Sequence, residues 1–196
     1  MPQAVALAII AGYADAVGYL RFKAFAGMMT GNTVLMGMAV FGHADLAVWT
    51  YAALLALFFA AAVTAYMFLP RFPPGLILGA EAVLILLADA ITARWAVVFL
   101  VLAMGLQNPV ATRLGVPLNT TFITGDILRF GEGLARRLAP HSSHGGRVPF
   151  AIFGLVWLGY AAGAALGTGI YELTPWPLIV PALLLGFVYW RARQAK

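Results

Sequence analysis

The pattern Thr-Gly-[Asn/Asp] followed by an apolar run occurs twice in this sequence, as Thr30-Gly31-Asn32-Thr33-Val34-Leu35-Met36-Gly37 and as Thr124-Gly125-Asp126-Ile127-Leu128-Arg129-Phe130-Gly131. A second pair of matching stretches lies before the two copies. Gly12-Tyr13-Ala14-Asp15-Ala16-Val17 aligns with Gly105-Leu106-Gln107-Asn108-Pro109-Val110 at nearly the same offset. After each copy come a longer apolar segment and then a shorter one. The sequence therefore predicts a single domain built from two four-segment internal repeats, over residues 1–94 and 95–196.

Each Thr-Gly-[Asn/Asp] motif is predicted to open a short helix. Threonine is a favourable N-cap, and Asn32 or Asp126 then falls in the first turn, where a carboxylate complements the helix dipole. The apolar runs at 30–42 and 124–138 are too short to cross about 30 Å of hydrocarbon as helix alone. We therefore expect both helices to begin inside the membrane, either as half of a broken crossing or as a re-entrant segment.

The composition indicates an integral membrane protein. Of 196 residues, 63% are hydrophobic and only 10% are charged, whereas soluble domains carry about 25% charged residues. This excludes a soluble enzyme, a nucleic-acid-binding protein and a disordered regulator. The predicted fold class is all-α and polytopic, with roughly six to eight spans of about 20 residues each. Its apolar segments lie at 3–20, 30–42, 46–68, 75–91, 95–112, 124–138, 149–171 and 176–190.

Two topologies fit these segments. If both short helices cross the membrane, the chain has eight spans and parallel repeats; if both are re-entrant, it has six spans and inverted repeats. Each arrangement puts both termini on the side with more Lys and Arg, which is the cytoplasmic side of a membrane protein. The charge distribution leans towards the re-entrant arrangement without deciding between the two.

The chain resembles the YoaK family of small bacterial inner-membrane proteins, a domain of unknown function. The resemblance rests on Gly12-Tyr13-Ala14-Asp15-Ala16-Val17-Gly18-Tyr19, Met29-Thr30-Gly31-Asn32-Thr33, Met104-Gly105-Leu106-Gln107-Asn108 and Thr121-Phe122-Ile123-Thr124-Gly125. These motifs cover about residues 10–130. The resemblance implies a multi-pass protein of the bacterial inner membrane, and it brings no established substrate.

Candidate substrate- or ion-binding residues lie in and beside the repeated motifs. Asp15 aligns with Asn108 and Asn32 aligns with Asp126, so each repeat holds one acid and one amide in exchanged positions. An ionisable side chain inside a membrane is costly and by default suggests a functional site. In transporters, helices that start inside the membrane direct their positive ends at the substrate. The predicted site comprises Asp15, Thr30, Gly31, Asn32, Gln107, Asn108, Thr124, Gly125 and Asp126.

A structural interpretation of the same residues stays open. Asp15 would then form a hydrogen bond between two helices, and the Thr-Gly motifs would be helix starts packed closely at glycine. Glu81 needs a partner such as Arg129 or a hydroxyl group, while Arg129 and Glu132 have the spacing of a structural ion pair. A small-residue stripe over residues 159–169 permits close helix packing within the chain or between two protomers.

The sequence favours a small-solute transporter or permease, with proton coupling as a further expectation from Asp15 and Asp126. The alternative is a membrane interaction or assembly protein in which these residues only stabilise the fold. No enzyme activity is predicted, because no nucleophile or acid–base set is recognisable. No cofactor or metal is predicted either: cysteine is absent, and His141 and His144 lack a third ligand. The expected partners are the lipid bilayer, a small polar or ionic solute and a second copy of the chain, with no nucleic acid.

Overall fold

The computed structural model describes residues 2–68, 71–113, 123–138 and 149–194. Eight α-helices and one short 3₁₀ turn occupy this part of the chain, and they agree with the eight predicted segments to within a few residues. They are α1 (Pro2–Phe22), α2 (Met29–Val40), α3 (Val48–Phe68), α4 (Pro74–Ala90), η1 (Arg94–Ala96), α5 (Val97–Arg113), α6 (Ile123–Leu138), α7 (Ala151–Leu173) and α8 (Ile179–Gln194). The predicted all-helical class is confirmed for the described residues.

The helices give the chain the character of a membrane-embedded protein. Four segments are long and apolar enough to cross a membrane: Pro2–Phe22, Val48–Phe68, Arg94–Thr112 and Ala151–Leu173. A further apolar helix covers Ile179–Arg191 and is shorter. Large apolar side chains such as Phe59, Leu158 and Leu183 are exposed on the surface. A surface of this kind is stable against lipid chains rather than water.

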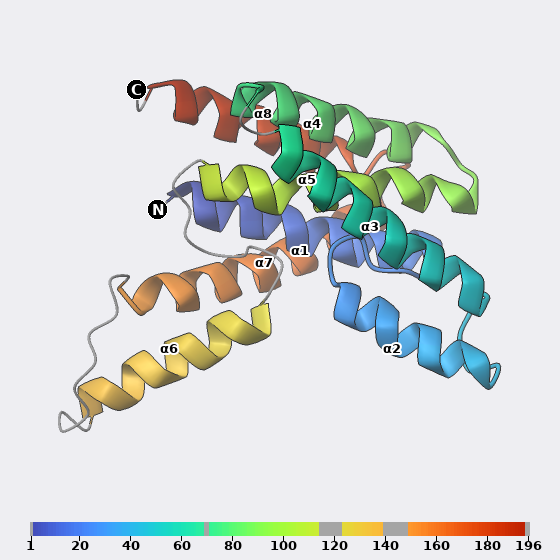
Figure 1. Cartoon of the computed structure of the whole chain (residues 1–196), viewed down its shortest axis with the longest axis horizontal. Coiled ribbons are helices and arrows are strands. Elements are labelled where there is room, and N and C mark those ends of the chain that lie inside the picture. Colours follow the sequence, from blue (N-terminus) through green and yellow to red (C-terminus); the bar gives the residue numbers. More distant parts are fainter. Residues whose placement is uncertain (1, 69–70, 114–122, 139–148, 195–196) are drawn as a thin grey trace.

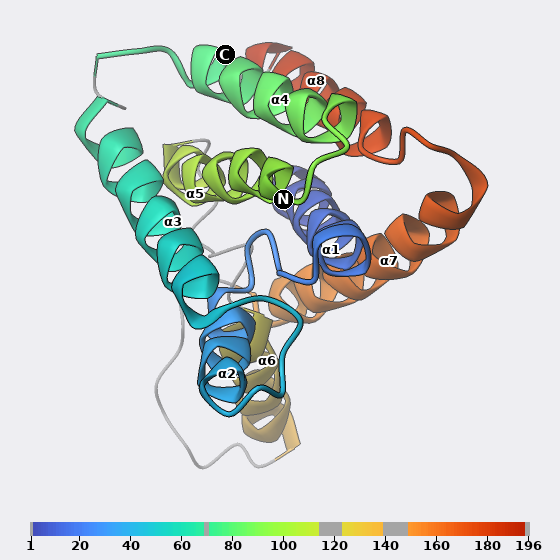
Figure 2. The same ribbon diagram turned by 90° about the vertical axis from the view of Figure 1, so that its right-hand side faces the viewer.

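Helices α1 and α5 form the centre of the bundle, and α3 and α7 lie at its periphery. Of the 18-residue apolar stretch in each of these helices, 61% is buried in α1 and in the η1–α5 segment, against 22% in α3 and 39% in α7. Helix α1 packs against α7, α8 and α5, while α5 packs against α3 and α4. Helix α4 also packs against α8, as Figures 1 and 2 both show.

Glycine allows the two central helices to approach their neighbours closely. A Cβ atom on Gly12 would lie 2.0 Å from the carbonyl oxygen of Tyr160 in α7. A Cβ atom on Gly105, which aligns with Gly12 in the sequence, would lie 2.9 Å from the carbonyl oxygen of Phe58 in α3. The matching glycines of α1 and α5 therefore pack against the backbone of α7 and α3, respectively, where any larger residue would push the helices apart.

The small-residue stripe of α7 packs within the chain. Added Cβ atoms on Gly163 and Gly167 would lie 2.1 Å and 2.9 Å from the carbonyl oxygens of Ile9 and Tyr13 in α1. Gly159 likewise faces Val5. Of the two arrangements that the stripe permitted, the structure uses the intramolecular one. A homodimer stays a prediction.

The two short helices begin in the middle of the molecule and run outwards in opposite directions (Figure 1). Helix α2 runs towards the end of the bundle where α1 finishes, and α6 runs towards the end where α5 finishes. Seen along this direction in Figure 2, α2 lies in front of α6. The N-terminal ends of the two helices therefore face each other across the centre of the molecule.

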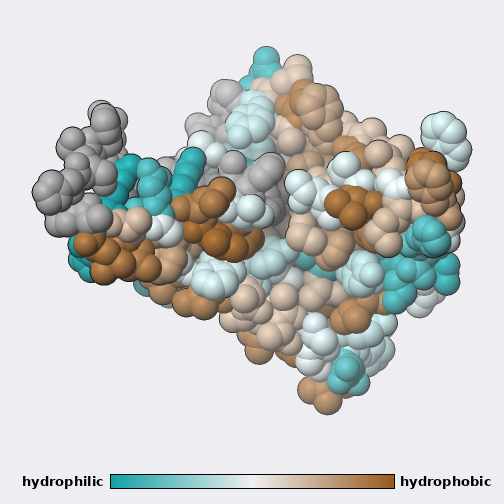
Figure 3. Space-filling model, turned by 90° about the horizontal axis from the view of Figure 1, so that it is seen from below, coloured by the Kyte–Doolittle hydropathy of each residue, from teal (hydrophilic) through white to brown (hydrophobic). Residues whose placement is uncertain are grey.

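The surface over α2 and α6 is apolar in large part. Figure 3 shows this face from below, with hydrophobic side chains over both short helices and hydrophilic groups towards the two outer ends. Exposed apolar side chains include Val34 and Met38 of α2 and Ile127 and Leu128 of α6. The two helices differ in charge, because α6 carries Asp126, four further charged side chains and a strongly polar face, whereas α2 has none.

Candidate functional site

Asp15 lies near the centre of α1, is 3% exposed, and has three hydrogen-bond donors directed at its carboxylate. Its Oδ1 atom accepts from the backbone N–H groups of Gly27 at 2.6 Å and Met28 at 3.1 Å. Its Oδ2 atom accepts from the hydroxyl group of Tyr160 at 2.6 Å. Charge-assisted bonds of this kind are strong in a low-dielectric interior. Asp15 therefore fastens α1 to α7 and to the start of α2.

Asn32 holds the segment before α2 from the other side. Its Oδ1 atom accepts from the backbone N–H of Phe25 at 2.9 Å, and its Nδ2 atom donates to the Phe25 carbonyl at 2.8 Å. The Phe25 ring stacks on Tyr19 with 4.9 Å between ring centroids, and a Cβ atom on Gly31 would lie 2.7 Å from that ring. Asp15, Gly31 and Asn32 thus all contact the segment before α2, and the contacts described are with the chain itself.

The two threonines do not cap their helices. Helix α2 begins at Met29 with Met28 as N-cap, and no side chain makes a capping hydrogen bond there. Helix α6 begins at Ile123. The N-cap interpretation of Thr30 and Thr124 was therefore wrong, because each threonine lies one residue inside its helix. Thr30, Thr124 and Gly125 are exposed instead.

Asp126 is buried in the first turn of α6 and is only 4% exposed. Its Oδ2 atom has no hydrogen-bond partner among the described residues. Arg129 lies one turn along the same helix, with its guanidinium group 5.5 Å from the centre of the Phe153 ring. Asp126 differs in this respect from Asn32, its counterpart in α2, whose amide is fully engaged.

Gln107 faces Glu81, a residue of α4, and both side chains are fully buried. Neither carboxyl oxygen of Glu81 makes a well-formed hydrogen bond to a described residue. The expected partner Arg129 lies over Phe153 instead, and Glu132 pairs with Arg136 rather than with Arg129. Asn108 is half-buried on α5, one position beyond Gln107. Gln107 therefore belongs to the α4–α5 contact, separate from the cluster around Asp15.

One polar cluster was not foreseen from the sequence. Arg21 of α1 forms an ion pair with Asp89 of α4 at 3.0 Å, and Asp89 also accepts from the backbone N–H of Leu178 at 3.0 Å. Beside it, the Tyr13 hydroxyl donates to the Pro177 carbonyl at 2.6 Å. These bonds join α1, α4 and the start of α8. The spacing of the residues along the chain gave no signal, because the partners are far apart in sequence.

Comparison with known proteins places the chain in a family. The model of a family described as a protein of unknown function, DUF1275, matches residues 3–190. The chain belongs to this family. No curated protein and no solved structure matches the chain.

The description of the DUF1275 family assigns no function to the chain. Two cavities lie between α1 and α8 and between α4 and α8, and neither is lined by a predicted site residue. The predicted residues instead form a bonded cluster around Asp15, a buried pair at Gln107, and the first turn of α6. Of these, Asp126 has a buried acceptor atom that the described chain leaves without a partner. The loop with His141 and His144, for which no metal site was predicted, lies outside the described residues.

Proposed function

We propose that this protein is a small-solute membrane transporter whose site lies where the N-terminal ends of α2 and α6 face each other. The observation that carries the proposal is the direction of these helices, which start in the middle of the molecule and run to opposite ends (Figure 1). Helix N-termini carry partial positive charge and free N–H groups. Two such ends that meet inside a membrane are a recurrent way to bind a polar solute there.

The packing of the helices supports an inverted repeat of residues 1–94 and 95–196. Helix α1 packs on α7 while α5 packs on α3, and α2 packs on α3 while α6 packs on α7. Helix α4 packs on α5 while α8 packs on α1. Exchange of α1–α4 with α5–α8 maps this set of contacts onto itself. A pseudo-two-fold axis of this kind is common in secondary transporters and gives two similar states that face opposite sides.

The proposed topology has six spans and two re-entrant helices. Both chain ends lie at the same end of the bundle (Figure 1), and each short helix returns to the end at which the preceding span finished. The end with the termini then carries Arg71, Arg113, Arg136, Arg137, Arg191 and Arg193, against Arg21, Lys23 and Arg94 at the other. By the positive-inside rule the first end faces the cytoplasm of a bacterial inner membrane.

Asp126 is proposed as the titratable member of the site. It combines burial with an unpartnered oxygen at the start of α6, and a carboxyl group in that position can exchange a proton or bind a cationic group. Asp15 and Asn32 are proposed to hold the α2 end of the site in place, because their bonds go to the backbone of residues 25–28.

A second candidate function is a membrane interaction or assembly role without transport. The hydrogen bonds of Asp15 and Asn32 favour this role. Of the four polar side-chain atoms of these two residues, three are hydrogen-bonded to backbone groups of the chain, and the fourth is bonded to Tyr160. In that case Asp126 would serve only to start α6. Neither proposal involves catalysis.

The experiment compares solute flux in liposomes that contain the wild-type chain, Asp126→Asn or Glu132→Gln. Glu132 is the matched control, because it lies on the same helix, is exposed and pairs with Arg136. The probes are glycerol, urea, alanine, glucose and potassium ions, with pyranine trapped inside to report proton movement. We expect at least one probe to exceed its flux in protein-free liposomes, and Asp126→Asn to lower that flux about tenfold or more while Glu132→Gln does not.

Two results would contradict the transport proposal. One is that no probe exceeds the protein-free rate while the protein is folded, which would favour the assembly role. The other is an unchanged flux for Asp126→Asn, which would remove Asp126 from the site. Size-exclusion chromatography in detergent checks that both variants fold. The Oδ2 atom of Asp126 accepts no hydrogen bond from a described residue, so its replacement by an amide removes no such bond.

A further inference from the structure

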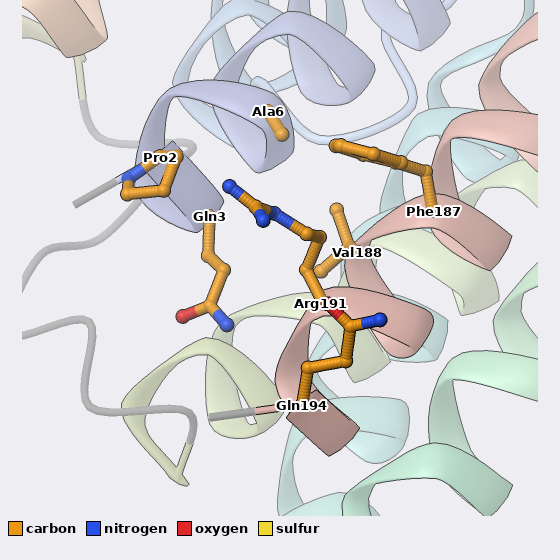
Figure 4. Close-up of a pocket in the computed structure, with 7 residues that line it drawn as sticks. All are labelled: Pro2, Gln3, Ala6, Phe187, Val188, Arg191 and Gln194. Carbon is orange, nitrogen blue, oxygen red and sulfur yellow. The ribbon is translucent and has the colours of Figure 1, made fainter.

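A cavity of about 450 Å³ opens between the first turns of α1 and the last turns of α8. It is lined by Pro2, Gln3 and Ala6 from α1 and by Phe187, Val188, Arg191 and Gln194 from α8 (Figure 4). Volumes of several hundred Å³ are typical of small-molecule sites. The cavity lies at the end of the bundle that holds both chain termini (Figure 1), and none of the candidate transport residues lines it.

Arg191 gives the cavity an unpaired positive charge. Its side chain extends from α8 across the cavity towards Pro2 and Gln3 (Figure 4). Within residues 2–68, 71–113, 123–138 and 149–194, Arg191 makes neither a hydrogen bond nor an ion pair. Two other arginines are engaged: Arg21 pairs with Asp89, and Arg193 lies 5.4 Å from the centre of the Tyr189 ring. No acidic side chain lines the cavity.

Further donors and an apolar wall complete the cavity. Helix α1 begins at Pro2, so the N–H groups of its first turn have no partner within the helix and add partial positive charge. The amide groups of Gln3 and Gln194 supply further donors. Ala6, Phe187 and Val188 form the apolar side. Cationic and amide groups thus lie beside apolar ones at the end of two membrane helices, where a lipid presents a phosphate group above its acyl chains.

We propose that this cavity binds the phosphate group of an anionic phospholipid of the inner leaflet. The Arg191 guanidinium group and the first turn of α1 bind the phosphate oxygens, Gln3 and Gln194 contact the headgroup, and Phe187 and Val188 pack against the upper acyl chain. Basic pockets between transmembrane helices on the cytoplasmic side bind anionic headgroups in this way. The surplus of arginine at this end of the bundle complements the charge of such lipids.

The test titrates the purified full chain in detergent with dioleoyl phosphatidylglycerol and counts bound lipids by native mass spectrometry. Dioleoyl phosphatidylcholine and inorganic phosphate are the comparison ligands. We expect one phosphatidylglycerol to bind more tightly than any phosphatidylcholine, and Arg191→Gln to weaken it about tenfold or more, because a charge-assisted contact is lost. Arg193→Gln is the matched control: it removes the same charge two residues away, outside the cavity, and should change the affinity less than twofold.

Three results would overturn the proposal. Equal binding of the two lipids would show an apolar groove without headgroup recognition. Equal effects of Arg191→Gln and Arg193→Gln would show a diffuse attraction to the basic end of the bundle. Binding of inorganic phosphate with no preference for the lipid would show a site for a soluble anion. A Gln3→Ala variant tests the opposite wall, and it should weaken phosphatidylglycerol binding by a smaller factor than Arg191→Gln.

Discussion

Replacement of Asp15 by alanine is expected to lower the thermal unfolding midpoint in detergent by about 6 °C or more. The substitution leaves the N–H groups of Gly27 and Met28 and the hydroxyl of Tyr160 without their acceptor. Each buried polar group that loses its partner costs about 1–3 kcal/mol. The loss falls on the contact between α1, α7 and the start of α2 together. Intrinsic tryptophan fluorescence during heating measures the midpoint.

Graded variants separate this contact from a general effect of lost charge. Tyr160→Phe removes one of the three bonds and should lower the midpoint by about a third as much. Asp15→Asn keeps an oxygen for the backbone N–H groups and should fall between these two variants. Asp45→Ala removes an exposed carboxylate from the α2–α3 connection and is the control. A midpoint for Asp15→Ala equal to that of the control would contradict the role assigned to Asp15.

Replacement of Gly12 by alanine is expected to destabilise the protein by about 2 kcal/mol or more, despite the higher helix propensity of alanine. The added methyl group would lie 2.0 Å from the carbonyl oxygen of Tyr160, which belongs to the backbone of α7. A helix backbone cannot move aside as a flexible side chain can, so α1 and α7 must separate along their whole contact. Thermal unfolding of the purified variant measures the change.

The same substitution at Gly169 provides a control of opposite sign. Gly169 also lies on α7, and no heavy atom would lie within 4 Å of its added Cβ atom. Gly169→Ala should therefore be neutral or stabilise the protein by up to about 1 kcal/mol. Equal effects of the two substitutions would show that close approach of α1 and α7 does not limit the fold.

The positions of the helices could be predicted because membrane helices leave a strong local signal. The apolar segments and the two short helices follow from segment length and from the repeated Thr-Gly-[Asn/Asp] motif alone. The helix starts were less predictable. Helix α2 starts one residue before Thr30, and the carboxylate of Asp15 in α1 binds the N–H groups of Gly27 and Met28 just before it, a contact that no local pattern announces.

The partners of the buried polar residues could not be predicted. Asp15 and Tyr160 are 145 residues apart, and Arg21 and Asp89 are 68 apart, so neither pairing has a local pattern. Glu81 was expected to need a cationic or hydroxyl partner, whereas the amide of Gln107 faces it. The sequence indicates which polar residues are costly to bury. What surrounds these residues follows only from the packing of α1 against α7 and of α4 against α5.

The re-entrant course of α2 and α6 is the central claim of this account, and cysteine labelling tests it directly. The chain has no cysteine of its own, so single variants Ala47→Cys, Phe72→Cys and Gln194→Cys can be labelled in intact and permeabilised cells with an impermeant maleimide. These positions lie in the α2–α3 connection, in the α3–α4 connection and at the end of α8. We predict that Phe72→Cys is labelled from the same side as Gln194→Cys, and Ala47→Cys from the opposite side. Labelling of Ala47→Cys from the side of Gln194→Cys, with Phe72→Cys opposite, would mean that the short helices cross the membrane and would contradict the account.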